Sequence, residues 1–246
     1  MHKYIYILAA VAMTACAKVP AEVGVTFSLG VPSGVITRAT PEGLSDAFTA
    51  TAPVGPFALD AVSTENPLRS YSVTTGVPIT MAVGPYSVTG SGSGASIQSV
   101  SKGKLMSSPS WSVSQTATVS EDGDEISLSA GYTCFALVFD LEEVSKVVFD
   151  YETNTAIAAF PGNERYAVVY PKPDGSWIAS SSLWVYVHPK DEVYGEVALY
   201  KIVTNNSDGD FVRVKNGNWY MLSPGRVQVT SGTMGLTFPE WTEGER

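Results

Sequence analysis

Turn-forming residues interrupt this chain so often that long helices are excluded. Gly, Pro, Ser, Asn and Asp separate short apolar stretches, and hardly any stretch keeps helical periodicity over three turns. Apolar and polar side chains alternate instead, as in residues 22–29, where Val23, Val25, Phe27 and Leu29 would share one face of a strand. In the second half the stretches recur at roughly the 8 to 12 residue spacing typical of sandwiches. The pattern predicts an all-β chain.

The length of the chain favours two sandwich domains. After a signal segment at residues 1–16, the remaining residues of the 246 divide at an acidic turn into residues 17–125 and 126–246. Each part has the size of an immunoglobulin-like or transthyretin-like sandwich. We therefore expect two tandem β-domains.

Two segments are predicted to lie outside strands. Residues 91–101 are rich in Gly and Ser and predict a flexible loop. Residues 121–125 read Glu-Asp-Gly-Asp-Glu and predict the solvated tip of a hairpin. This acidic run lacks the ligand spacing of an EF-hand, so we do not expect calcium binding there.

The amino terminus has the features of a secretion signal. Residues 4–13 form an unbroken apolar run, which is shorter than the roughly 20 residues that span a bilayer. Met13, Thr14 and Ala15 precede Cys16 in the pattern of a bacterial lipobox. A diacylglycerol on Cys16 would anchor the protein to a membrane. The alternative is an ordinary signal peptide that is cut nearby, with Cys16 incidental.

Composition argues against several kinds of chemistry. The net charge is -9, with 19 acidic and 9 basic residues after Ser120 and no basic stripe, which excludes nucleic acid as a partner. Cys134 lies in an apolar run and is expected to be a buried thiol. His188 is the only histidine beyond the signal, so neither a histidine-based triad nor a zinc site is expected. We expect no enzyme activity, cofactor or metal.

Aromatic residues in the second half suggest a binding function. Trp184 and Tyr186 would share one face of a strand, and Trp177 lies close in sequence. Such rings could stack on sugars, or they could pack in the core of the sandwich. Glycan binding at the cell surface is therefore one function to consider, and it is the alternative to the structural or adhesive role described below.

Short motifs along the chain are shared with one group of bacterial surface proteins. They are the lipobox at Cys16, the strand at 22–29, the run Thr37, Arg38, Ala39, the sequence Val-Gly-Pro-Tyr-Ser-Val at 83–88, the segment at 109–111, and the aromatic segments at 219–225 and 238–242. In this combination the chain resembles the fimbrillin-like surface lipoproteins of Bacteroidales, which include type V pilus subunits and their lipid-anchored relatives.

The resemblance implies a pair of Greek-key β-sandwiches and a structural or adhesive role as a pilus subunit, anchor or adhesin. In polymerising members of the group, a trypsin-like protease cuts after an arginine, the first strand leaves, and the groove accepts a strand from the next subunit. A cut between Arg38 and Ala39 would correspond to this step, although Arg38 could equally be an ordinary loop residue. The partners would be a membrane, other pilus subunits or surface ligands.

The resemblance also implies an outer-membrane location with a lipid anchor and exposure at the cell surface. Proteins exported to the outer face usually carry an acidic cluster just after the lipidated cysteine. Only Glu22 is acidic between residues 17 and 22, so the face of the membrane stays open.

Overall fold

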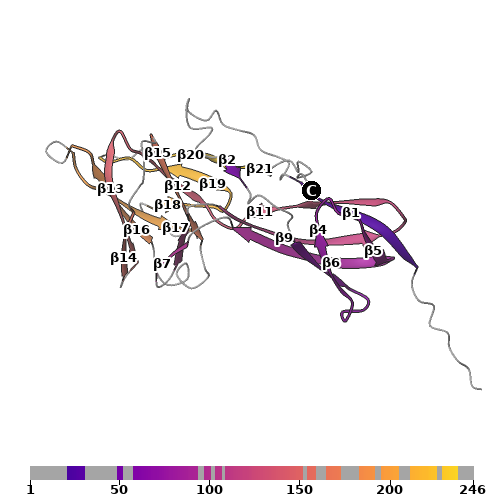
Figure 1. Cartoon of the computed structure of the whole chain (residues 1–246). Coiled ribbons are helices and arrows are strands. Elements are labelled where there is room, and N and C mark those ends of the chain that lie inside the picture. Colours follow the sequence, from indigo (N-terminus) through magenta and orange to yellow (C-terminus); the bar gives the residue numbers. More distant parts are fainter. Residues whose placement is uncertain are drawn as a thin grey trace, which may run out of the picture.

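The computed structural model describes residues 21–30, 49–51, 58–93, 97–100, 103–106, 109–151, 154–158, 165–172, 183–191, 195–204, 211–225 and 229–237. Every regular element within these ranges is a β-strand, which confirms the all-β prediction (Figure 1). None of the described residues forms a helix of the length and hydropathy needed to cross a membrane.

Two sheets make up the end of the molecule where the first strand lies (Figure 1). The smaller sheet has the order β10-β1-β5, with β10 (Asp124–Ser129), β1 (Glu22–Gly30) and β5 (Ile79–Ala82). The larger has the order β11-β9-β6-β3-β4, with β11 (Gly131–Tyr132), β9 (Ser110–Val119), β6 (Gly84–Ser93), β3 (Ala58–Ser63) and β4 (Ser70–Thr74).

One hydrophobic core joins these two sheets. Phe27, Met81 and Leu128 from the smaller sheet pack in the same cluster as Tyr86 and Trp111 from the larger sheet, and all five are fully buried. Burial of this kind contributes roughly 1.5 to 3 kcal/mol for each large side chain. The two sheets therefore form a sandwich.

Two further sheets form the other end. One has the order β20-β19-β12-β15-β8-β7, with β20 (Thr230–Thr233), β19 (Asn218–Met221), β12 (Ala136–Asp140), β15 (Tyr166–Lys172), β8 (Gly103–Met106) and β7 (Ile97–Val100). The second has the order β14-β13-β16-β17-β18, with β14 (Asn154–Ala158), β13 (Val144–Tyr151), β16 (Leu183–Pro189), β17 (Ala198–Val203) and β18 (Val212–Arg213).

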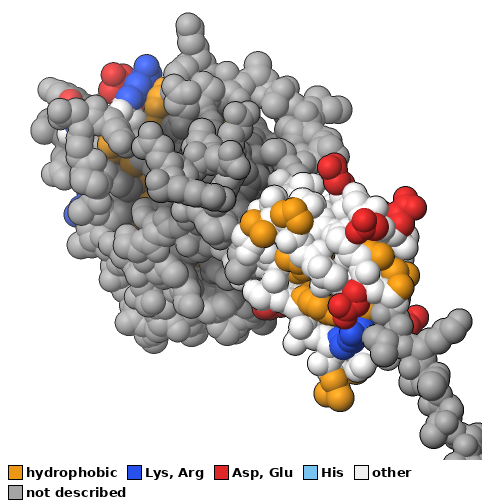
Figure 2. Space-filling view, turned by 45° about the vertical axis from the view of Figure 1, so that its right-hand side comes forward, with side chains coloured by type: hydrophobic (Ala, Val, Ile, Leu, Met, Phe, Trp, Pro, Cys, Tyr) orange, Lys and Arg blue, Asp and Glu red, His pale blue; other side chains and the backbone are white. Residues whose placement is uncertain are grey.

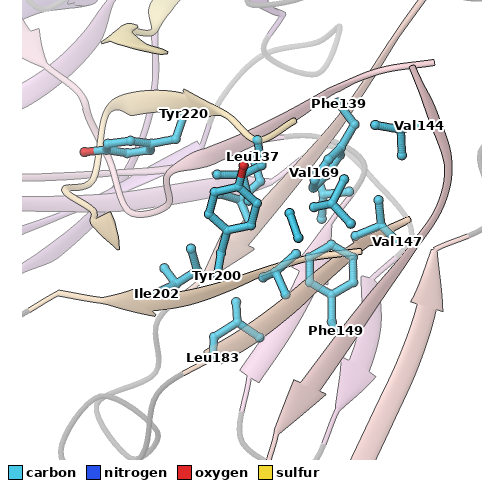
Figure 3. Packing of buried hydrophobic residues seen from close by; sticks show 14 of the residues in the cluster. Leu137, Phe139, Val144, Val147, Phe149, Val169, Leu183, Tyr200, Ile202 and Tyr220 are labelled. Carbon is cyan, nitrogen blue, oxygen red and sulfur yellow. The ribbon is translucent and has the colours of Figure 1, made fainter. Parts of the chain in front are cut away.

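A second core lies between these sheets (Figure 3). Leu137 and Phe139 of β12 meet Phe149 of β13 and Leu183 of β16, and the rings of Phe139 and Phe149 pack edge to face with centroids 6.2 Å apart. The opposite face of β12 contributes to a third cluster, which contains Cys134, Ala136 and Val138. β12 is therefore buried on both faces, in keeping with its continuous apolar sequence.

Tyr132 connects the two ends of the molecule. Its side chain packs against both the cluster around Phe27 and the cluster around Cys134. The chain also crosses between the ends elsewhere, because β7 and β8 come from the first half of the sequence but pair within the sheet of the second half. Finally, β2 (Thr49–Thr51) pairs in parallel with β21 (Gly235–Thr237).

The prediction of a loop at residues 91–101 is wrong for residues 91–93 and 97–100, which lie in strands, while residues 94–96 and 101 lie outside the described residues. β6 continues through Ser93, and β7 begins at Ile97. Glycine is required within β6 for packing: a β-carbon on Gly92 would lie 2.4 Å from the Trp111 ring, and one on Gly90 would lie 2.1 Å from the Leu59 side chain. The glycines make room for large core side chains, which the local sequence does not reveal.

The predicted hairpin at residues 121–125 is also wrong. β9 and β10, which flank this turn, belong to different sheets, and β10 pairs with β1. The acidic turn therefore carries the chain from one sheet of the sandwich to the other.

Candidate functional site

The candidate site is the groove between β5 and β10, which β1 fills. β1 runs parallel to β10, from Val25 opposite Asp124 to Gly30 opposite Ser129. It runs antiparallel to β5, from Glu22 opposite Ala82 to Val25 opposite Ile79. β1 is the only strand between them in this sheet of the described chain, so its removal would leave an open edge on both β5 and β10.

The side chains of β1 that face inward are apolar and complete the core of the sandwich. Val25 and Phe27 are fully buried, and Val23 and Leu29, at either side, are partly buried against the same core. Thr26 and Ser28 lie between them on the opposite face. A strand with apolar side chains at alternate positions therefore completes this sandwich.

Further backbone contacts hold the two ends of β1. Val83 N donates a hydrogen bond to the carbonyl oxygen of Ala21 at 2.9 Å, and Gly76 N donates to that of Phe27 at 2.7 Å. The Arg69 guanidinium lies 3.1 Å from a Glu22 carboxylate oxygen. This ion pair is partly exposed and so contributes little to stability.

The acidic turn holds β1 at Gly24. Gly24 N donates a hydrogen bond to Asp122 Oδ1 at 2.8 Å. Gly123 N donates to the carbonyl oxygen of Gly24, also at 2.8 Å. Sequence reasoning missed this role because Gly24 and Asp122 are 98 residues apart. The Asp-Gly pair signals a turn, but nothing local indicates which strand the turn contacts.

Four residues singled out by the sequence, Cys16, Arg38, Ala39 and Trp177, lie outside the described residues. Their proposed roles in lipidation, processing and sugar stacking stay predictions.

Trp184 and Tyr186 lie on the outer face of β16. Both are partly buried, whereas Leu183, Val185 and Val187 alternate with them and are fully buried on the inner face. The Lys201 ammonium lies 5.2 Å from the centroid of the Trp184 ring. The two aromatic residues therefore share one outward face, and sugar binding there stays a prediction.

Cys134 and His188 have the surroundings expected of ordinary structural residues. Cys134 is fully buried, and Ser110 N donates a hydrogen bond to its sulfur at 3.3 Å. His188 is partly buried near the end of β16, and its backbone carbonyl accepts a hydrogen bond from the Ser145 hydroxyl.

The surface at the β1 end of the molecule is mixed in character. Figure 2 shows acidic side chains spread over this face, with hydrophobic side chains scattered among them. Leu68, Val77 and Val83 are exposed hydrophobic residues of this half. Scattered exposed apolar residues are normal on soluble proteins, so the groove of β1 remains the candidate site.

No protein-family model matches the sequence, and no curated protein is similar to it in sequence. Among solved structures, a candidate cell adhesion protein from Bacteroides eggerthii is similar with a TM-score of 0.50 and 9% identity, over 89% of this chain and 98% of that one.

Two further solved structures are similar at lower scores. A fimbrial assembly protein from Parabacteroides distasonis has a TM-score of 0.43 and 12% identity, over 86% of this chain and 94% of that one. The fimbrial anchor protein Mfa2 from Porphyromonas gingivalis has a TM-score of 0.30 and 9% identity, over 88% and 99%. The likeness to the Bacteroides eggerthii protein establishes the fold, and this chain therefore shares the all-β architecture that its resemblance to fimbrillin-like proteins implied.

Proposed function

We propose that this protein is a lipid-anchored adhesion or pilus protein of the cell surface, and that its groove accepts a strand from another subunit when β1 leaves. The observation that carries the proposal is the position of β1 between β5 and β10. Its loss would expose backbone N–H and C=O groups on two edges and open the core at Val25 and Phe27. A strand of similar pattern repairs both defects at once.

The chain contains a second segment of the required pattern. Residues 23–27 read Val-Gly-Val-Thr-Phe, and residues 234–238 read Met-Gly-Leu-Thr-Phe. Gly, Thr and Phe occupy the same places in both, and the other two places are apolar. The carboxyl-terminal segment of another copy therefore has the side chains to replace those of β1.

The position of Arg38 fits a role in releasing β1. Arg38 lies between β1 and β2 in the sequence, so a cut after it separates β1 from the remaining chain. The fold shared with a candidate Bacteroides cell adhesion protein supports a structural rather than an enzymatic role. Uncut, the same chain would serve as a permanently anchored subunit or adhesin.

The test uses the purified full chain without its signal segment, treated with a trypsin-like protease. We expect a cut after Arg38, followed by multimers that resist detergent at room temperature. Arg38→Ala should stay uncut and monomeric. Phe238→Ala should be cut normally but should form several-fold fewer multimers, because it lacks the side chain that would fill the Phe27 position. A cut chain that keeps β1 and remains monomeric would contradict the proposal.

A further inference from the structure

We infer that the turn at residues 121–124 sets the register of the strand in the groove by requiring glycine at the position that faces Asp122. The inference applies to β1 directly. It rests on the proposed function only where the strand comes from another copy. The ligand class is a β-strand with glycine between two apolar residues.

The turn takes the place of a missing strand neighbour. β10 begins at Asp124, opposite Val25, so Gly24 lies just beyond the end of the β1–β10 pairing. The Asp122 carboxylate accepts the Gly24 N–H, and Gly123 N donates to the Gly24 carbonyl oxygen. Both backbone groups of Gly24 are thereby satisfied by the turn.

The same contact leaves little room for a side chain. A β-carbon on residue 24 would lie 3.0 Å from Asp122 Oδ1, and no other atom in the described part of the chain would be as near. The carboxylate would have to move by a few tenths of an ångström, and its hydrogen bond to Gly24 N would weaken. The acceptor of the N–H is thus also the group that a side chain on residue 24 would have to displace.

The turn is fixed by contacts of its own. Asp124 Oδ2 accepts hydrogen bonds from Ser120 N at 2.7 Å and from Glu121 N at 3.1 Å. Gly123 has a φ of 88°, which favours glycine. Asp124 therefore shapes the turn, while Asp122 contacts the strand.

The register of β1 is set by which residue lies opposite Asp122. A slip by two residues keeps the apolar face inward but places Glu22 or Thr26 opposite Asp122. Glu22 would bring a second negative charge to the carboxylate, and Thr26 would bring a β-branched side chain. Only the observed register places Gly24 there. In the carboxyl-terminal segment, Gly235 occupies the equivalent place.

The first test is a double-mutant cycle in the full chain, measured by urea unfolding. Gly24→Ala should lower the folding equilibrium constant about tenfold when Asp122 is present. With Asp122→Ala the sign should reverse, and Gly24→Ala should raise the constant about two- to fivefold, because glycine in a strand is entropically costly. Equal effects of Gly24→Ala in both backgrounds would overturn the inference.

Two controls separate this contact from a general effect. Gly131→Ala, in β11, adds a β-carbon that meets no atom of the described residues within 4 Å, so its effect should be insensitive to Asp122→Ala. Asp122→Asn keeps the acceptor oxygen and should therefore keep the preference for glycine at position 24. If this variant lost the preference for glycine, the inferred role of the acceptor oxygen would be contradicted. If a double variant does not fold, hydrogen exchange decides the question. The Gly24 amide should exchange at least tenfold faster in Asp122→Ala, while the Val88 amide should be unchanged.

A second experiment separates this inference from the proposed function. The full chain, cut after Arg38 but retaining its β1 fragment, is mixed with a labelled peptide of residues 21–30 or its Gly24→Ala form. We expect the glycine peptide to exchange in about tenfold better. Equal uptake of both peptides would refute glycine selection but support strand addition. If neither peptide is taken up, strand addition is refuted. The turn's role in β1 still stands in that case, provided that the double-mutant cycle shows coupling between Gly24 and Asp122.

Discussion

Buried tyrosines show how single polar groups are accommodated in this sandwich. Tyr86 is fully buried, and its hydroxyl donates a hydrogen bond to the Ala82 carbonyl oxygen at 2.7 Å. The Tyr200 hydroxyl donates to the Ser223 carbonyl oxygen at 2.6 Å and accepts from Ser223 N at 3.0 Å. Each hydroxyl ties a strand to the backbone of another segment, as the tyrosine corner does in other sandwiches.

Stability should decline at alkaline pH because of Tyr170. Burial, and after it the proximity of Cys134, raises the pKa of Tyr170 to about 12. In the unfolded chain a tyrosine loses its proton near pH 10. The stabilisation is therefore complete below pH 10 and is lost as pH rises to about 12, which amounts to about 2 to 3 kcal/mol.

The measurement is the free energy of unfolding in urea between pH 8 and pH 12. Tyr170→Phe should show a smaller decline over this range. Tyr132, Tyr86 and Tyr200, whose pKa values burial also raises, should account for the decline that remains. An identical decline in Tyr170→Phe and the unaltered chain would rule out this cause.

Among the elements, alternation predicts some strands closely. Residues 22–29 and 111–119 were expected as strands, and the structure has β1 at Glu22–Gly30 and β9 at Ser110–Val119. Each has one buried face, so the two-residue period is visible in the sequence.

The pairing of the strands could not be read in this way. Alternation says which face of a strand is buried but not which strand lies beside it. The sequence therefore did not predict that β1 lies between β5 and β10, or that the acidic turn reaches Gly24. The strand character of residues 91–93 was hidden for a related reason, because Gly92 makes room for the ring of Trp111 on a neighbouring strand.

Glycine at position 92 should be essential to the pairing of β6 with β9. A β-carbon there would lie 2.4 Å from the buried Trp111 ring, so Gly92→Ala should destabilise the protein by about 1 to 3 kcal/mol. Chemical denaturation measures this effect, with Gly131→Ala as the exposed control that should cost almost nothing. A stabilising Gly92→Ala would show that the Trp111 ring can move aside.

At the scale of the whole molecule, a partly buried residue joins the two ends. Tyr132 contacts the clusters on both sides, and β12 separates two clusters with its two faces. The sequence-based division into domains at residue 125 stays a prediction. The structure adds that β7 and β8 cross from the first half of the sequence into a sheet of the second.

The proposed anchor concerns the whole molecule as well, because it fixes where the protein resides. Cys16→Ala removes the site of acylation, so this variant should leave the membrane fraction and appear in the soluble fraction of the cell envelope. Fractionation followed by detection of the protein measures the distribution. Cys16→Ser is the matched variant and should behave in the same way. Retention of both variants in the membrane would contradict anchoring by a lipid on Cys16.

The position of β1 also determines how the protein would respond to mechanical load. β1 begins at one extremity of the molecule and runs back along its length (Figure 1). Tension between an attachment at its amino-terminal end and a ligand held at the opposite extremity would act along the strand axis. The ladder bonds to β5 and β10 would then be sheared together instead of being peeled one at a time. The strand proposed to be exchanged is thus also placed to resist being pulled out.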